Sequence, residues 1–158
     1  MWARWRPILL MAAGFFAITV VARLLSRFVA DNNDKVETRI GYVAFGAVAV
    51  TAGVLAVLWG RRYRAGQVIF DVGGAILIAC LLSVLVGPFI SGDTPFESGA
   101  GSFFAQIWAY CGVGFGGGLL GLLGLIALGL DHRSQALKRY AQARGARASK
   151  LSRPNRAR

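Results

Sequence analysis

Residues 111–129 read CGVGFGGGLLGLLGLIALG, and this stretch decides which class of fold the chain adopts. It contains eight glycines and no charged side chain. In water, each glycine in a helix costs about 1 kcal/mol relative to alanine, so such a run disfavours a soluble helix. In a bilayer the backbone must form its hydrogen bonds internally, and small side chains let neighbouring helices approach closely. The stretch therefore predicts a membrane helix packed tightly against its neighbours.

The composition of the whole chain agrees with a membrane protein. Of the 158 residues 56% are hydrophobic, and the mean hydropathy is +0.55. Charged residues make up 16%, against roughly 25% in soluble domains. Arginine far outnumbers lysine, which with the many alanines, glycines and valines is typical of a GC-rich bacterial genome. We expect a multi-pass protein of the bacterial cytoplasmic (inner) membrane.

Four apolar runs are long enough to cross a bilayer. A run of about 20 residues, rising ~1.5 Å per residue as a helix, covers a hydrocarbon core of ~30 Å. Membrane strands would need alternating segments of ~10 residues, which these runs do not show. A cleaved signal peptide is an alternative for the first run, but apolar sequence continues beyond the weak cleavage-like site at 20–22. The expected helices are about 7–29, 40–60, 67–90 and 103–130.

The distribution of basic residues predicts the orientation. Fourteen of the 18 Lys and Arg residues fall on one side of the four spans, and five of the seven acids fall on the other. Because basic residues are retained on the cytoplasmic side, we expect an all-α, up-down four-helix bundle with both termini in the cytoplasm. The basic tail at 131–158 begins with helical periodicity, whereas Gly145 and Pro154 predict disorder towards its end.

Small residues recur on single faces of the spans. Glycines in the fourth span are three, four and three residues apart, and the second span has a similar stripe, a spacing suited to close helix contact. The alternative is that small residues are merely common in such membrane helices. Gly112 and Gly116 fall on the opposite face of the fourth span, and we expect them to meet a partner chain or a second protomer. The expected helix-packing residues are Gly46, Gly53, Gly114, Gly117, Gly121 and Gly124.

Three charged side chains lie within the apolar runs. Asp71 is about four residues into its run, and we expect an anchor paired with the arginines at 61–64 rather than an ion site. Arg23 and Arg27 share one helix face near the outer boundary. We expect both to snorkel towards the headgroups; the alternative is that they bind an anionic group or the loop acids at 93 and 97.

The remaining residues suggest no catalytic chemistry. Cys80 and Cys111 are expected at similar depths, where they could touch, and small buried thiols explain both. The single histidine, His132, is too little for a histidine-based metal or haem site. We find no nucleophile–base pair, acid pair or phosphate loop. We therefore expect no enzyme activity, no cofactor and no bound metal.

The function expected from these features is that of an accessory or scaffolding protein, which binds other membrane proteins or anionic lipid. The alternative is a protomer of a small oligomeric channel or transporter, which the lack of charge at mid-depth disfavours. For the basic tail, contact with anionic lipid is favoured over a role in topology alone, and nucleic acid is the least favoured partner. The tail residues expected at the lipid are Arg133, Lys138, Arg139, Arg144 and Arg147.

Overall fold

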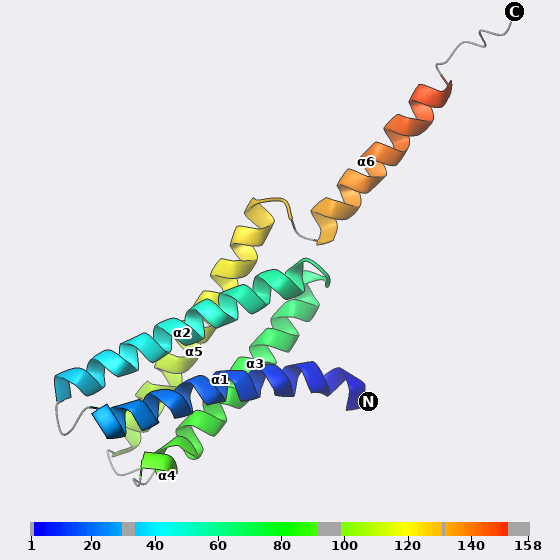
Figure 1. The fold of residues 1–158 in the computed structure, drawn as a ribbon. Coiled ribbons are helices and arrows are strands. Elements are labelled where there is room, and N and C mark those ends of the chain that lie inside the picture. Colours follow the sequence, from blue (N-terminus) through cyan, green and yellow to red (C-terminus); the bar gives the residue numbers. More distant parts are fainter. Residues whose placement is uncertain (1, 30–33, 92–98, 131, 152–158) are drawn as a thin grey trace, which may run out of the picture.

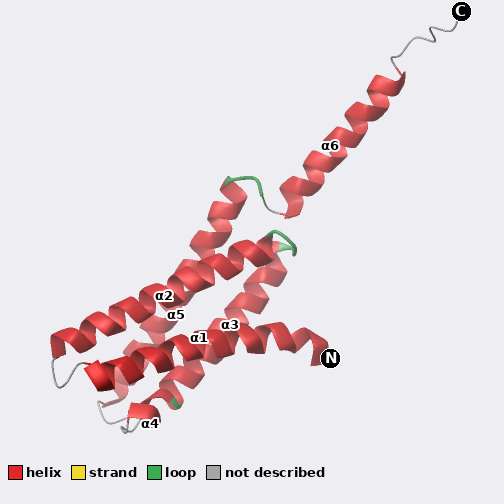
Figure 2. Cartoon of the chain, viewed as in Figure 1, coloured by secondary structure: helices red, strands yellow, loops and turns green. Residues whose placement is uncertain are grey.

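The computed structural model describes residues 2–29, 34–91, 99–130 and 132–151. Within these ranges the chain consists of helices and short turns and contains no strand, which confirms the all-α prediction (Figures 1 and 2). The helices are α1 (Trp2–Val29), α2 (Asp34–Gly60), α3 (Ala65–Leu85), α4 (Gly87–Ser91), α5 (Gly99–Ala127) and α6 (His132–Leu151).

Four of these helices are long and apolar enough to cross a membrane, as the sequence predicts. The shortest of them, α3, has 21 residues, which at ~1.5 Å per residue covers a hydrocarbon core of ~30 Å. The candidate spans are Trp5–Val29, Lys35–Gly60, Ala65–Leu85 and Gly99–Ala127.

The third span is broken near its end, whereas we expected one helix over 67–90. The helix α3 stops at Leu85, Val86 caps it by donating its amide to the Leu82 carbonyl at 2.8 Å, and the short helix α4 follows. Pro88 explains the break. It has no N–H to donate, its ring conflicts with the carbonyl of the preceding turn, and it disfavours helical geometry in the residue before it.

The fourth span also ends earlier than the expected residue 130. The helix α5 closes at Ala127 with two backbone bonds characteristic of a Schellman motif: the Leu130 amide donates to the Leu125 carbonyl at 3.1 Å, and the Gly129 amide to the Ile126 carbonyl at 2.9 Å. Gly129 has φ +61°, a conformation that glycine adopts without steric cost. The apolar run therefore continues past the helix into its capping turn.

The bundle is built from two pairs of helices, each running in the same direction. One pair is α1 with α3, and the other is α2 with α5; α2 and α5 have the most extensive contact of any two helices. The neighbouring residues are Ile8 with Gly74 and Thr19 with Ser83 for the first pair, and Ala49 with Gly117 and Gly53 with Gly121 for the second.

Apolar side chains fill the interior and also cover the outside. Phe15, Ile8 and Ile76 are among the largest fully buried side chains, and α3 is the most buried of the four spans. On the exterior, Phe28 is 80% exposed and Trp108 is 78% exposed, with many leucines and valines around them. Monomeric soluble proteins rarely expose contiguous apolar surface on this scale, so the exterior suits contact with lipid.

The last helix, α6, extends away from the bundle beyond the end of α5 (Figure 1). It continues through Gly145 to Leu151, whereas we expected Gly145 to end the ordered part of the tail. A single glycine in a helix costs about 1 kcal/mol, and the alanines, lysines and arginines around it favour the helix. Pro154 and the disorder predicted around it lie outside the described residues.

Candidate functional site

The contact between α2 and α5 is made by backbone against backbone. A Cβ atom added at Gly121 would lie 2.7 Å from the Cα of Gly53, and one at Gly117 would lie 2.7 Å from the Cα of Ala49. These separations are shorter than any real Cβ contact, and the backbone atoms involved cannot move aside as a flexible side chain could. Only glycine fits at Gly117 and Gly121 in this arrangement.

The contact follows a four-residue spacing rather than the three-four spacing that the sequence analysis assumed. Gly117 meets Ala49 and Gly121 meets Gly53, so each helix advances by four residues between contacts, the pattern of small-xxx-small interfaces. Gly46 and Gly124 therefore differ from the expectation, since a Cβ added at either would meet no atom within 4 Å. Residues spaced four apart wind around a helix in a different direction from residues spaced seven apart. A contact that advances by four residues therefore does not include Gly46 and Gly124.

The helix α5 uses a further glycine against α3. A Cβ at Gly114 would lie 2.8 Å from the Ile76 Cγ2, so this position also depends on a small residue. Two other close-contact positions, Gly60 and Gly73, are not among the expected helix-packing residues. A Cβ added at Gly60 would lie 2.5 Å from the side chain of Leu125, and one added at Gly73 would lie 3.2 Å from that of Phe115. Of the two, only Gly60 belongs to the stripe of small residues in the second span.

Gly112 and Gly116 have open space around them. No atom lies within 4 Å of the place where a Cβ would stand at either residue, although both belong to the same helix as Gly117 and Gly121. The helix α5 therefore carries a tightly occupied small-residue face and an open one. That the open face receives a partner stays a prediction.

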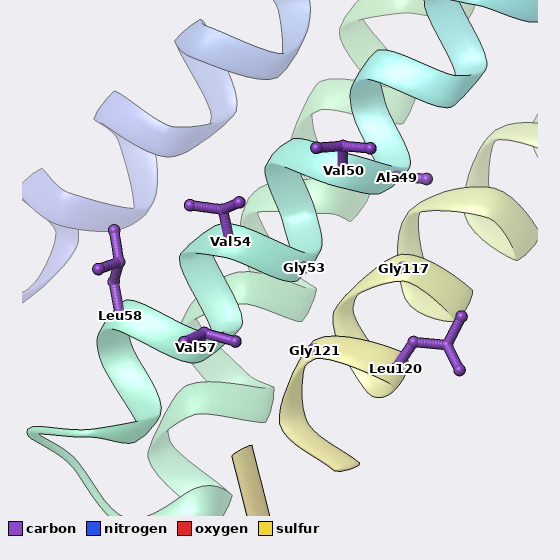
Figure 3. A pocket seen from close by; sticks show the side chains of 9 residues that line it. All are labelled: Ala49, Val50, Gly53, Val54, Val57, Leu58, Gly117, Leu120 and Gly121. Atoms are coloured by element: carbon purple, nitrogen blue, oxygen red, sulfur yellow. The ribbon is translucent and has the colours of Figure 1, made fainter. Parts of the chain in front are cut away.

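An apolar groove of about 450 Å³ lies along the α2–α5 contact. Figure 3 shows Gly53, Gly117 and Gly121 where the two helices meet, with apolar side chains of α2 on one side and Leu120 on the other. The lining residues are Ala49, Val50, Gly53, Val54, Val57, Leu58, Gly117, Leu120 and Gly121.

The end of the α1–α3 contact that lies nearest α4 is polar. The hydroxyl oxygens of Thr19 and Ser83 lie 2.8 Å apart. Thr19 donates its single hydroxyl hydrogen to the Phe16 carbonyl at 2.7 Å, so Ser83 is the donor to Thr19. Ser83 is itself buried, which places this bond between the helices and away from lipid.

Arg23 and Arg27 turn towards the broken end of the third span, whereas we expected them to snorkel to the headgroups. Arg23 donates to the Ser83 carbonyl at 3.4 Å, and its guanidinium would lie 2.7 Å from a Cβ added at Gly87. Arg27 donates to the Ile90 carbonyl at 3.2 Å. Ser83 lies in the last turn of α3 and Ile90 in the last turn of α4, so both arginines bind carbonyl groups near helix ends. The loop acids offered as alternative partners, at 93 and 97, lie outside the described residues.

Asp71 is buried in α3, with 4% of its surface exposed. We expected an anchor paired with the arginines at 61–64, but these side chains are exposed in the turn between α2 and α3. Among the described residues no ion pair joins them to Asp71. Asp71 is therefore buried among the helices, in the second turn of α3.

The two cysteines lie side by side in the bundle, as their depths suggested was possible. Both are free thiols, and Cys80 directs its sulfur towards the Ile107 carbonyl at 4.0 Å. Tyr110 is buried nearby; its ring meets that of Phe45 edge-on, with centroids 6.4 Å apart. Within the described part of the chain, its hydroxyl group has no hydrogen-bond partner.

The beginning of the tail is tied to the end of α5. Lys138 donates its ammonium group to the Gly129 carbonyl at 3.2 Å, and Gln135 donates to the Leu130 carbonyl at 2.9 Å. Arg139 and Arg144 are exposed along α6. The backbone of Arg133 and Arg147 belongs to α6, and their side chains lie outside the described residues.

Comparison with known proteins does not assign the chain to a family. The chain matches no protein-family model, no curated protein sequence and no solved structure. Over the described ranges, no group of three or more histidine, cysteine, aspartate or glutamate side chains is placed to hold a metal ion.

Proposed function

We propose that this chain is an accessory or scaffolding protein of the bacterial cytoplasmic membrane that binds other membrane proteins through α5. The observation that supports the proposal is the open face at Gly112 and Gly116, where no atom lies within 4 Å of an added Cβ. In a bilayer, helices associate where small residues let their backbones approach. The α2–α5 contact shows how this same helix binds a neighbour when such a face is occupied.

Crosslinking in native membranes tests the partner face. A photoreactive amino acid at Trp108, which is exposed and four residues before Gly112 on the same face, should capture a foreign membrane protein in stoichiometric yield. Gly116→Leu should abolish the capture without lowering thermal stability, because the position is open. Gly14→Leu is the matched control, since Gly14 is an open glycine of α1. Capture that survives Gly116→Leu would show that this face is not the interface.

The proposed arrangement places the spans up and down, with both termini in the cytoplasm. Its support is the distribution of basic residues, of which fourteen out of 18 fall on one side. Reporter fusions after Tyr63 and Arg144 should report the cytoplasm, and fusions at residues 33 and 98 the external side. An external reading after Arg144 would overturn the orientation.

For the tail we propose contact with anionic lipid, with nucleic acid as the less favoured partner. The exposed arginines of α6 support this, because each basic residue held at an anionic surface contributes up to about 1 kcal/mol. A peptide of residues 131–158 should bind vesicles containing phosphatidylglycerol, ignore phosphatidylcholine vesicles, and dissociate at about 1 M salt. Equal binding to both kinds of vesicle would contradict the electrostatic explanation.

A protomer of a small channel or transporter is the second candidate, and the burial of Asp71 favours it. Carboxyl groups inside a membrane bundle commonly mark ion or proton pathways. Protein reconstituted in liposomes should then conduct ions or protons, and Asp71→Asn should abolish the flux while the helical content stays unchanged. Lack of flux in the unmodified protein would remove this candidate.

A further inference from the structure

The groove between α2 and α5 extends over about half of the expected membrane thickness. On α2 its lining forms two rows of every fourth residue, one from Ala49 to Val57 and the other from Val50 to Leu58. These rows cover about 14 Å of helix, close to half of a ~30 Å hydrocarbon core. A groove of this length matches one leaflet rather than the whole bilayer.

Both rows of α2 lead directly to a basic residue. Four residues after Val57 comes Arg61, and four residues after Leu58 comes Arg62; both side chains are exposed. The Arg61 amide still donates to the Val57 carbonyl at 3.2 Å, so the helical geometry reaches Arg61. Arg61 therefore stands in line with the groove just beyond Val57, and Arg62, whose amide donates to the Trp59 carbonyl at 2.9 Å, follows it in the turn.

Aromatic side chains mark this end of the groove as the membrane interface. The rings of Trp59 and Tyr63 lie 6.1 Å apart at the turn that carries the arginines. Tryptophan and tyrosine gather where hydrocarbon meets the headgroup layer. Along α2 the apolar groove is followed by Trp59 and then by Arg61, which is the order of acyl chain, interface and phosphate in one leaflet.

On the α5 side, the groove remains open towards the same end. Gly124 lies on the same face as Gly117, seven residues further along, and no atom lies within 4 Å of an added Cβ there. The glycine that we expected in the helix contact instead leaves open space one turn beyond Leu120 on the same helix.

We propose that this groove binds one acyl chain of an anionic phospholipid, whose phosphate group faces Arg61 and Arg62. A crossing helix of another protein has no need of two arginines at one end of the groove. A phospholipid matches the length, the apolar lining and the position of the positive charge. The proposal requires the chain to lie in a bilayer, and it does not depend on the scaffolding role or on the open face of α5.

Native mass spectrometry of the full-length protein in detergent tests the apolar part of the site. With phosphatidylglycerol added, the unmodified protein should retain one lipid under conditions that remove all others. Val54→Trp fills the groove from α2, and Leu120→Trp fills it from α5; each should lower the retained lipid at least tenfold. Val43→Trp is the matched control, because Val43 is an exposed residue of α2 outside the groove. Unchanged retention in both groove variants would overturn the proposal.

The headgroup part is tested by comparing phosphatidylglycerol with phosphatidylcholine in the same experiment. The unmodified protein should prefer the anionic lipid, and the double variant Arg61→Gln/Arg62→Gln should lose this preference by about fivefold for each arginine. Lys35→Gln/Arg39→Gln, with equal charge removed from the opposite end of α2, should keep it. An unchanged preference in the first double variant would overturn the headgroup assignment, and a dimer that Val54→Trp dissociates would show that a second copy occupies the groove instead.

Discussion

The two parallel helix pairs of this bundle are held together by different physical means. The helices α2 and α5 meet through glycine backbone at Gly53, Gly117 and Gly121, in a contact with an apolar surface. The helices α1 and α3 meet, at the end nearest α4, through the hydroxyl groups of Thr19 and Ser83 and through the Arg23 guanidinium. The α2–α5 contact depends on the absence of side chains at glycine, and the α1–α3 contact depends on polar side chains.

This difference reflects the two interactions available to helices in lipid. Hydrocarbon chains are as apolar as leucine, so burial of apolar side chains gives little net drive to association in a membrane. Close van der Waals packing of small residues supplies one interaction, and interhelical hydrogen bonds supply the other. We expect close packing to tolerate substitution far less, because a backbone contact cannot be relaxed by moving a side chain.

The largest effect is expected for Gly121→Leu. A leucine there would overlap the backbone of α2 at Gly53 and force the two helices apart. Overpacking of a core costs about 1–3 kcal/mol, and we expect the upper end of this range or more, because no side chain can yield. Unfolding of the detergent-solubilised protein, followed by circular dichroism, measures the loss.

Gly116→Leu is the matched control for that measurement. It introduces the same side chain into the same helix, but at a position where no atom lies within 4 Å of an added Cβ. We expect its stability to stay within about 0.5 kcal/mol of the unmodified protein. Equal losses in the two variants would mean that α5 does not meet α2 through Gly121.

An intermediate effect is expected for Arg23→Met. The variant keeps an apolar stem and removes the charged donor to the Ser83 carbonyl, a kind of bond that contributes about 1.5–3 kcal/mol. Arg27→Met is the comparison, because Arg27 makes an equivalent bond to the Ile90 carbonyl from an exposed position, where water or headgroups can replace it. We expect at least 1 kcal/mol between the two variants in equilibrium unfolding. A larger loss for Arg27→Met would contradict the assignment of Arg23 as the interhelical ligand.

The features that depend on composition along one segment could be predicted from the sequence. The four membrane-length helices follow from apolar runs whose length is set by bilayer thickness. The sequence also indicated that one face of the fourth span, with Gly117 and Gly121, is suited to close contact. Neither property requires knowledge of how distant segments meet.

The features that depend on relative placement could not be predicted. Gly124 and Gly46 lie outside the contact because α2 and α5 meet in four-residue steps, and the sequence does not contain the crossing geometry of two helices. Arg23 binds α3 because its guanidinium lies against Ser83 and Gly87, where the third span breaks. Snorkelling was the reasonable expectation for Arg23 as long as the third span was thought to be continuous.

The smallest effect is expected at the Thr19–Ser83 hydrogen bond. Interhelical hydrogen bonds in membrane proteins contribute about 0.6 kcal/mol on average, since the separated helices find other partners. Thr19→Val and Ser83→Ala should each destabilise the bundle slightly, and the double variant should lose less than the sum of the two. A double-mutant cycle by equilibrium unfolding should give a coupling near 0.6 kcal/mol. A coupling of zero would show that the 2.8 Å contact adds nothing to the α1–α3 pair, whereas a coupling comparable to the Gly121→Leu loss would erase the difference between the two helix pairs.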